Sequence, residues 1–176
     1  MKRFCQVFSV WTIALAAMMF ITAPGQTAAA NSGFGFSASL QNQQMSVGVP
    51  IWVGDGLILD PSLGLLLISE GNTNLNFGLG LRIFPTAPDK SDAAFFYVEP
   101  MFEMFMVTPN EGDGVTDLAV GAGFGGEYFF NDRQFSIAIE GQLKALLPDE
   151  ASNRFSSGGE TVITTGAEVT ASVYLN

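Results

Sequence analysis

The chain has 176 residues, enough for one domain, and it combines a formal net charge of −10 with a hydrophobic fraction of 48%. This acidic balance does not match the basic surfaces that bind nucleic acid, so we expect no nucleic-acid partner. The absence of histidine excludes Ser-His-Asp triads, Cys-His pairs and HExxH zinc sites. Only 14% of the residues are charged. So low a charged fraction together with so high a hydrophobic fraction suggests that the folded chain is surrounded by a solvent other than water.

The first thirty residues have the pattern of a cleavable signal peptide. Lys2 and Arg3 form a basic start, residues 8–21 are apolar, and residues 27–30 are small, as at a signal-peptidase site. We therefore expect residues 1–30 to be removed after Sec-type export, so that the mature domain begins near Asn31 and spans 31–176.

A transmembrane anchor helix is the alternative for this segment. Such a helix needs about 20 apolar residues, and this run ends earlier, at Ala23-Pro24-Gly25. Cleavage would also remove Cys5, the only cysteine, together with the two basic residues Lys2 and Arg3. Five basic and seventeen acidic residues then remain, which gives a mature charge of −12.

After Asn31 the apolar residues alternate with period two rather than with a helical period. In residues 74–84, for example, Leu75, Phe77 and Leu79 point one way while Gly78 and Arg82 point the other. The pattern and the intervening turn residues predict eight strands, at 34–41, 45–53, 57–69, 74–84, 94–108, 116–130, 135–145 and 163–175.

Many of these strands reach the nine to eleven residues with which a tilted strand crosses a bilayer. Long alternating strands with short connections close most simply into an up-and-down barrel, which removes edges that lipid would disfavour. We therefore predict an all-β, eight-stranded antiparallel transmembrane barrel with its oily face outward. The alternative is a soluble secreted lipid-binding barrel, in which the same oily face would form the core.

Aromatic residues gather near one rim of the predicted barrel. That rim holds twelve of the seventeen aromatic residues after Ala30, and we interpret it as an interfacial girdle. Its expected members are Phe34, Phe36, Trp52, Phe96, Tyr97, Tyr128, Phe130 and Phe135, with Phe84, Phe95, Phe129 and Tyr174 at the same rim.

Charged residues on the non-oily faces would lie in the lumen. They are Asp60, Arg82, Glu99, Glu103, Asp117, Glu127, Glu140, Lys144 and Glu168. Buried charges need partners, so we expect Arg82 and Lys144 to lie among carboxylates of neighbouring strands, such as Glu99, Glu127, Glu140 and Glu168. Seven carboxylates against two cations leave an excess that water or a bound cation would relieve.

The mature chain as a whole resembles the small eight-stranded outer-membrane barrels of the OmpA and OmpX type. The resemblance is carried by the signal peptide, the eight alternating strands and the final strand, residues 168–175. It implies that both termini face the periplasm, and that lipid and the barrel insertion machinery are partners. The chain departs from the pattern at its end, Tyr174-Leu175-Asn176, because such barrels usually close on an aromatic residue.

Two further patterns carry no chemistry in our interpretation. Residues 121–126 contain a GxGxxG spacing, but a dinucleotide site needs this motif to open a helix, and here it lies inside a strand. Glu99 and Glu103 could in principle act on a glycan, but no cleft is predicted for one. We expect no enzyme activity, no cofactor and no metal.

The sequence thus predicts an integral protein of the outer membrane of a Gram-negative-type bacterium, with a structural or surface-interaction role. The alternative function is a narrow, porin-like, cation-preferring pore, because carboxylate-lined constrictions favour cations. Of the outer loops, only residues 148–159, with Arg154 and Phe155, are long enough to present a sizeable epitope to a ligand.

Overall fold

A computed structural model describes residues 33–41, 44–67, 73–89, 93–108, 114–130, 133–152 and 159–175. The predicted signal peptide lies outside the described residues. The strands are β1 Gly33–Gln41, β2 Gln44–Gly48, β3 Ile51–Gly54, β4 Leu57–Leu67, β5 Thr73–Ile83, β6 Ala93–Thr108, β7 Val115–Phe130, β8 Phe135–Leu147 and β9 Val162–Leu175. No helix among the described residues is long and apolar enough to cross a membrane.

β2 and β3 together form the second strand of the barrel, which is interrupted at Val49-Pro50. Proline has no backbone N–H to give to a ladder, so regular pairing stops there. The neighbouring strands bridge the gap: the Gly35 amide donates to the Pro50 carbonyl at 2.8 Å, and the Val49 amide donates to the Pro61 carbonyl at 3.0 Å. The count of eight strands predicted from the sequence is therefore confirmed.

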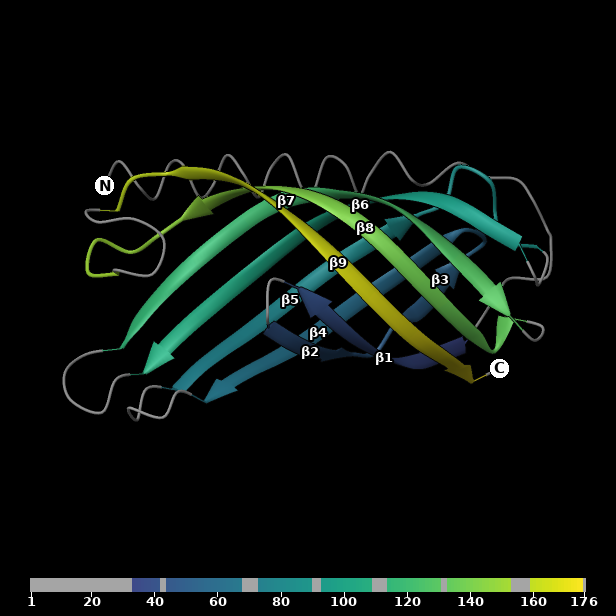
Figure 1. Cartoon of the computed structure of the whole chain (residues 1–176), viewed down its shortest axis with the longest axis horizontal. Coiled ribbons are helices and arrows are strands. Elements are labelled where there is room, and N and C mark those ends of the chain that lie inside the picture. The colour runs from purple at the N-terminus through teal and green to yellow at the C-terminus, as the bar shows by residue number, and fades with distance from the viewer. Residues whose placement is uncertain are drawn as a thin grey trace.

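With β2 and β3 counted as one strand, each strand pairs antiparallel with the next, and β1 pairs with β9 to close the cylinder (Figure 1). The closing register runs from Phe34 opposite Leu175 to Gln41 opposite Glu168. We call the end of the barrel where β1 begins and β9 stops the terminal end. The opposite end, which includes the β8–β9 connection, is the loop end.

Side chains alternate strictly between the two faces of the wall, most clearly in β8. There Ile137, Ile139 and Leu143 are exposed on the outside, while Glu140 and Gln142 are buried inside. Ile139 keeps 64% of its surface exposed and the adjacent Glu140 only 5%. A soluble barrel would reverse this arrangement, so the outward apolar face argues against the soluble alternative.

The turn between β3 and β4 at the terminal end is tight. Gly56, between β3 and β4, has a φ of +78°, a left-handed conformation that glycine adopts without strain. Its carbonyl accepts a hydrogen bond from the Phe84 amide at 2.8 Å, which ties this turn to the end of β5. The terminal end is thus held by backbone contacts as well as by the side chains inside it.

Candidate functional site in the barrel interior

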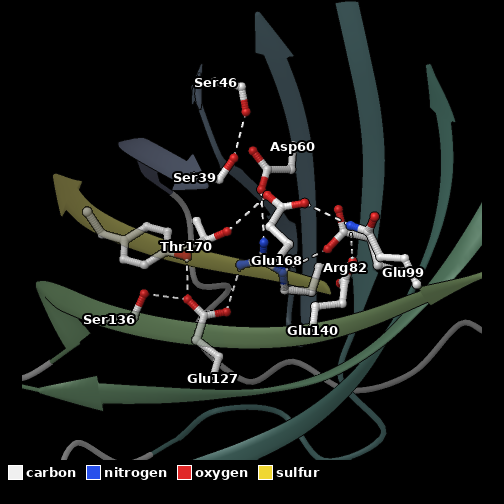
Figure 2. A network of polar contacts seen from close by, with 12 residues as sticks. Ser39, Ser46, Asp60, Arg82, Glu99, Glu127, Ser136, Glu140, Glu168 and Thr170 are labelled. Atoms are coloured by element: carbon white, nitrogen blue, oxygen red, sulfur yellow. Dashed lines mark hydrogen bonds and ion pairs between the residues drawn. The ribbon is translucent and has the colours of Figure 1, made fainter. Parts of the chain in front are cut away.

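Arg82 is the centre of the polar interior. Its side chain extends from β5, is 3% exposed, and uses each of its three nitrogens for a different carboxylate. Nε donates to Glu99 at 3.0 Å, Nη1 to Glu127 at 2.8 Å and Nη2 to Asp60 at 3.0 Å. These carboxylates come from β6, β7 and β4 and approach the guanidinium from different sides (Figure 2). A planar fork of donors suits such a site better than a lysine ammonium would.

Glu127 extends this network to the last two strands. Its side chain is fully buried, and its second oxygen accepts hydrogen bonds from the Ser136 hydroxyl at 2.5 Å and the Tyr174 hydroxyl at 2.9 Å. Ser136 lies on β8 and Tyr174 on β9. One connected set of polar contacts therefore spans six consecutive strands, from β4 to β9.

A second polar group lies towards the loop end. The Gln142 amide nitrogen donates to Glu140 at 2.7 Å and to Glu168 at 2.8 Å, and the Gln142 carbonyl accepts from the amide of Gln41. The Thr170 hydroxyl donates to Glu168 at 3.2 Å. This group links β8 and β9 to β1, where the barrel closes.

The three remaining predicted members of the lumen network, Glu103, Asp117 and Lys144, have other partners. Lys144 pairs with Glu103 at 2.7 Å, a carboxylate that we did not expect as its partner. Asp117 accepts hydrogen bonds from the Asp149 amide at 2.8 Å and the Ser152 hydroxyl at 2.7 Å. Asp117 therefore anchors the β8–β9 connection over the loop end rather than joining the central network.

Glycines on β5 and β7 leave room for these long side chains. A Cβ at Gly121 would lie 2.9 Å from the Lys144 side chain, and a Cβ at Gly125 would lie 2.6 Å from the Tyr97 ring. Cβ atoms at Gly80 and Gly123 would likewise clash with the carboxylates of Glu99 and Glu140, respectively. Small residues are thus required wherever a neighbouring side chain crosses the inner wall.

Aromatic rings fill the terminal end of the interior. Trp52, Phe84, Tyr97, Phe129 and Tyr174 form a buried cluster with ring centroids 5.5–6.2 Å apart. The half-buried ring of Phe95 packs against it. The Arg82 guanidinium lies over the Tyr97 ring, 4.8 Å from its centroid, so this cluster and the charge network are in direct contact.

This cluster corrects part of the predicted girdle. Trp52 and Tyr97 are 7% and 3% exposed and face the lumen, not lipid. Phe84, Phe129 and Tyr174, which we had placed at the same rim, are likewise buried in the interior cluster. The sequence indicated the interior position of Tyr97, because Tyr97 lies two residues before Glu99 and therefore on the same face of its strand. The other six predicted girdle residues lie on the outside: Phe34, Phe36, Phe96, Tyr128, Phe130 and Phe135.

A polar cavity of about 50 Å³ lies beside the network, behind β1 and β2. Its lining includes Ser37 and Ser39 of β1, Asp60 of β4 and Glu168 of β9. A water needs roughly 10–15 Å³ of such space, so a few waters or one small polar group would fit. The interior is therefore closed by rings at the terminal end but holds open polar space at mid-height.

Comparison with known proteins gives a likeness of fold. No family model matches the chain, and no curated protein matches it. Among solved structures, the N-terminal β-barrel domain of Pseudomonas aeruginosa OprF superposes with a TM-score of 0.51 at 14% sequence identity. The match covers 83% of this chain and 99% of that domain. The resemblance to small eight-stranded outer-membrane barrels is thus confirmed at the level of fold.

Proposed function

We propose that this chain is an integral outer-membrane β-barrel protein of a Gram-negative-type bacterium, without enzyme activity, whose role is structural or interactive. The observation that carries the proposal is the inverted wall, with exposed Ile137 and Ile139 outside and buried Glu140 and Gln142 inside. An outer surface of this kind is stable in lipid because it is apolar. A charged residue on the same face would cost about 2–4 kcal/mol at mid-bilayer. The fold shared with the OprF barrel domain supports the same location.

Cell fractionation tests this proposal. The full chain, expressed with residues 1–30, should appear in the outer-membrane fraction, and its gel mobility should shift when the sample is boiled. Recovery of a folded chain in the periplasm or the medium would contradict it. A variant with Lys2 and Arg3 changed to glutamine should accumulate as uncleaved precursor if the first thirty residues direct export.

A narrow cation-preferring pore remains the second candidate. It is favoured by the carboxylates around the cavity, Asp60, Glu99, Glu103, Glu140 and Glu168, which outnumber the lining cation, Arg82. The aromatic cluster argues against it, because the Trp52, Phe84 and Phe129 rings fill the terminal end of the lumen. Eight strands also leave little open interior once side chains are in place.

Planar-bilayer recording separates these two functions. We expect silent bilayers from the wild-type barrel. Conductance steps that disappear when Glu99, Glu103 and Glu127 are changed to glutamine would instead establish the pore.

A surface-interaction role would use the loop end. Asp117 holds Asp149 and Ser152, so the start of the β8–β9 connection is fixed to the barrel. Residues 153–158, which include the predicted epitope residues Arg154 and Phe155, lie outside the described residues. Replacing residues 153–158 with a Gly-Ser segment of equal length should abolish surface binding by a partner while leaving the heat-dependent gel shift unchanged.

A further inference from the structure

The wall of the barrel is lower at β1 than at β8. β1 has 9 residues and β8 has 13. Both strands start near the same level at the terminal end, because Val173 of β9 pairs with Phe36 on one side and with Phe135 on the other. The difference in length therefore falls at the loop end. There β9 continues from Ala167 back to Val162 beyond its last pair with β1, as Figure 1 shows.

The strands are tilted, so the pairing climbs towards the loop end when it is followed round the cylinder in chain order. A path that starts at Ser37 of β1 reaches β9 at Val162, although Ser37 itself lies opposite Ser172. One circuit thus climbs ten residues along β9, from 172 to 162. With strands tilted by about 40°, each residue adds roughly 2.5 Å of height and each of the pairing steps about 3 Å. The path runs through Ser37, Gly48, Ser62, Gly78, Glu103, Ala119, Leu146 and Val162.

This geometry places Met45 of β2 level with Leu143 of β8. Ile139 of β8 pairs with Val169 of β9, which pairs with Leu40 of β1. Leu40 in turn pairs with Met45, so Met45 lies three pairing steps, or about 9 Å, above Ile139. Leu143 lies four residues above Ile139 on its own strand, which is about 10 Å. Both side chains point outward and are more than half exposed, so they can be compared at equal height.

The apolar outer surface ends at this level on β1 and β2 but continues on β8. Leu40 and Met45 are the last outward residues of the β1–β2 hairpin, whose strands end with the polar pair Gln41 and Gln44. On β8 the outward row continues to Leu147, about 10 Å higher. We call the β1–β2 hairpin the low side of the barrel and β8 the high side.

The edge of β9 above the low side also requires polar surroundings. Residues Val162 to Ala167 pair with β8 but have no partner towards β1 among the described strands. In an antiparallel ladder about half of the backbone groups of such a segment point to the unpaired side. Hydrocarbon cannot satisfy these groups, whereas water and lipid headgroups can. The low apolar wall and the unpaired edge therefore make the same demand at the same place.

We propose that the low side thins the membrane, so that the headgroups of the leaflet at the loop end descend beside β1 and β2 to the level of Gln41 and Gln44. Outer-membrane barrels carry an apolar band about 25 Å tall. The outward rows Phe34–Leu40 of β1 and Met45–Val53 of β2 and β3 span only about 15 and 20 Å. A bilayer accommodates a short apolar surface by thinning around it. This inference rests on the proposed membrane location and extends it to the shape of the surrounding lipid.

Depth measurements with single labels test the proposal. The only cysteine, Cys5, lies in the predicted signal peptide, so Met45→Cys and Leu143→Cys can be labelled singly in a Cys5→Ser background. In phosphatidylcholine vesicles, the depth of each label follows from its quenching by nitroxides on the headgroup and on the acyl chain. The label at position 45 should lie about 5–10 Å nearer to the headgroups than the label at position 143. Equal depths would overturn the proposal.

A second pair of labels distinguishes thinning from a tilt of the whole barrel. Phe36 lies two pairing steps above Phe135, and Ile137 lies two residues above Phe135, so positions 36 and 137 are level to within about 1 Å near the terminal end. Local thinning at the loop end leaves Phe36→Cys and Ile137→Cys equally deep. A label at position 36 that lies deeper than one at position 137 would show that the barrel tilts instead, and would overturn the proposal.

A lengthened hairpin supplies a matched variant. Val-Thr inserted after Gln41 and Thr-Val inserted before Gln44 keep the alternation of faces and raise the low side by two residues, or about 5 Å. The label at position 45 should then lie about 5 Å further from the headgroups, and an unchanged depth would count against thinning. The heat-dependent gel shift shows that each variant is inserted. A wild-type barrel without this shift would overturn the membrane location itself.

Discussion

The terminal and loop halves of the barrel are built differently. In the terminal half, all eight strands are paired, five buried rings fill the lumen, and Arg82 pairs with one oxygen of each of three carboxylates at 2.8–3.0 Å. In the loop half, residues Val162 to Ala167 of β9 have no partner towards β1 among the described strands, and the side-chain oxygens of Asn74 and Asn76 have no partner among the described residues. The difference teaches that the packed rings and the central ion pairs are concentrated in the half of the barrel where β1 begins and β9 stops.

The largest effect should follow from removing the central cation. Arg82→Met leaves Asp60, Glu99 and Glu127 facing one another without compensation, and we expect a loss of about 3–5 kcal/mol in the free energy of unfolding. The free energy of unfolding is measured by urea titration, with the heat-dependent gel shift as the readout of the folded fraction. Lys144→Met in the loop half breaks a single ion pair and should cost clearly less. If the two variants were equally stable, the distinction between the halves would be wrong.

The aromatic cluster should contribute almost as much. Phe129 is fully buried, so Phe129→Ala opens a cavity in the terminal half and should cost about 3–5 kcal/mol. Phe96 lies on the outside of the same end and is 82% exposed, so Phe96→Ala should cost much less in the same titration. A reversed order would mean that the girdle, rather than the interior cluster, stabilises this end.

A charge on the outer face tests the lipid contact of the wall. Ile139→Arg on β8 should destabilise the barrel in vesicles by about 2–4 kcal/mol, because its guanidinium would meet hydrocarbon. Thr108→Arg, at the loop end of β6, is the control and should cost about 0–1 kcal/mol, since it lies near the interface. Equal costs would argue against a depth-dependent lipid environment.

The smallest of these effects concerns space inside the wall. Gly125→Val would press on the Tyr97 ring 2.6 Å away, and we expect overpacking to cost about 1–3 kcal/mol. Gly141 on β8 points outward, and a Cβ at this position would meet no neighbouring atom within 4 Å, so Gly141→Ala should be neutral. Both variants are compared by the same urea titration. If Gly141→Ala were also destabilised, the strand itself would not tolerate an added side chain, and the loss in Gly125→Val could not be assigned to crowding of the interior.

Much of this organisation could be predicted from the sequence because strand side chains alternate with period two. That period places Leu75, Phe77 and Ile137 outside and Arg82 and Glu140 inside without any knowledge of pairing. The interior positions of Trp52 and Tyr97 were missed because the girdle was predicted from closeness to one rim of the barrel. The face of the strand on which each side chain lies decides whether it points to lipid or to the lumen.

Contacts across strands could not be predicted in the same way. The Lys144 side chain reaches Glu103 across Gly121, a diagonal that depends on the register of β6, β7 and β8. Register follows from strand pairing around the whole cylinder, which no single strand encodes.

The central claim is that the wall is inverted, with apolar side chains against lipid and charges inside. Single-cysteine scanning along β8, from position 135 to 147, measures this most directly when each label is tested against quenchers on the acyl chains of the lipid. The account predicts strong quenching at odd positions, such as 137, 139 and 143, and weak quenching at even positions, such as 140 and 142. Uniform quenching, or strong quenching at the even positions, would contradict it.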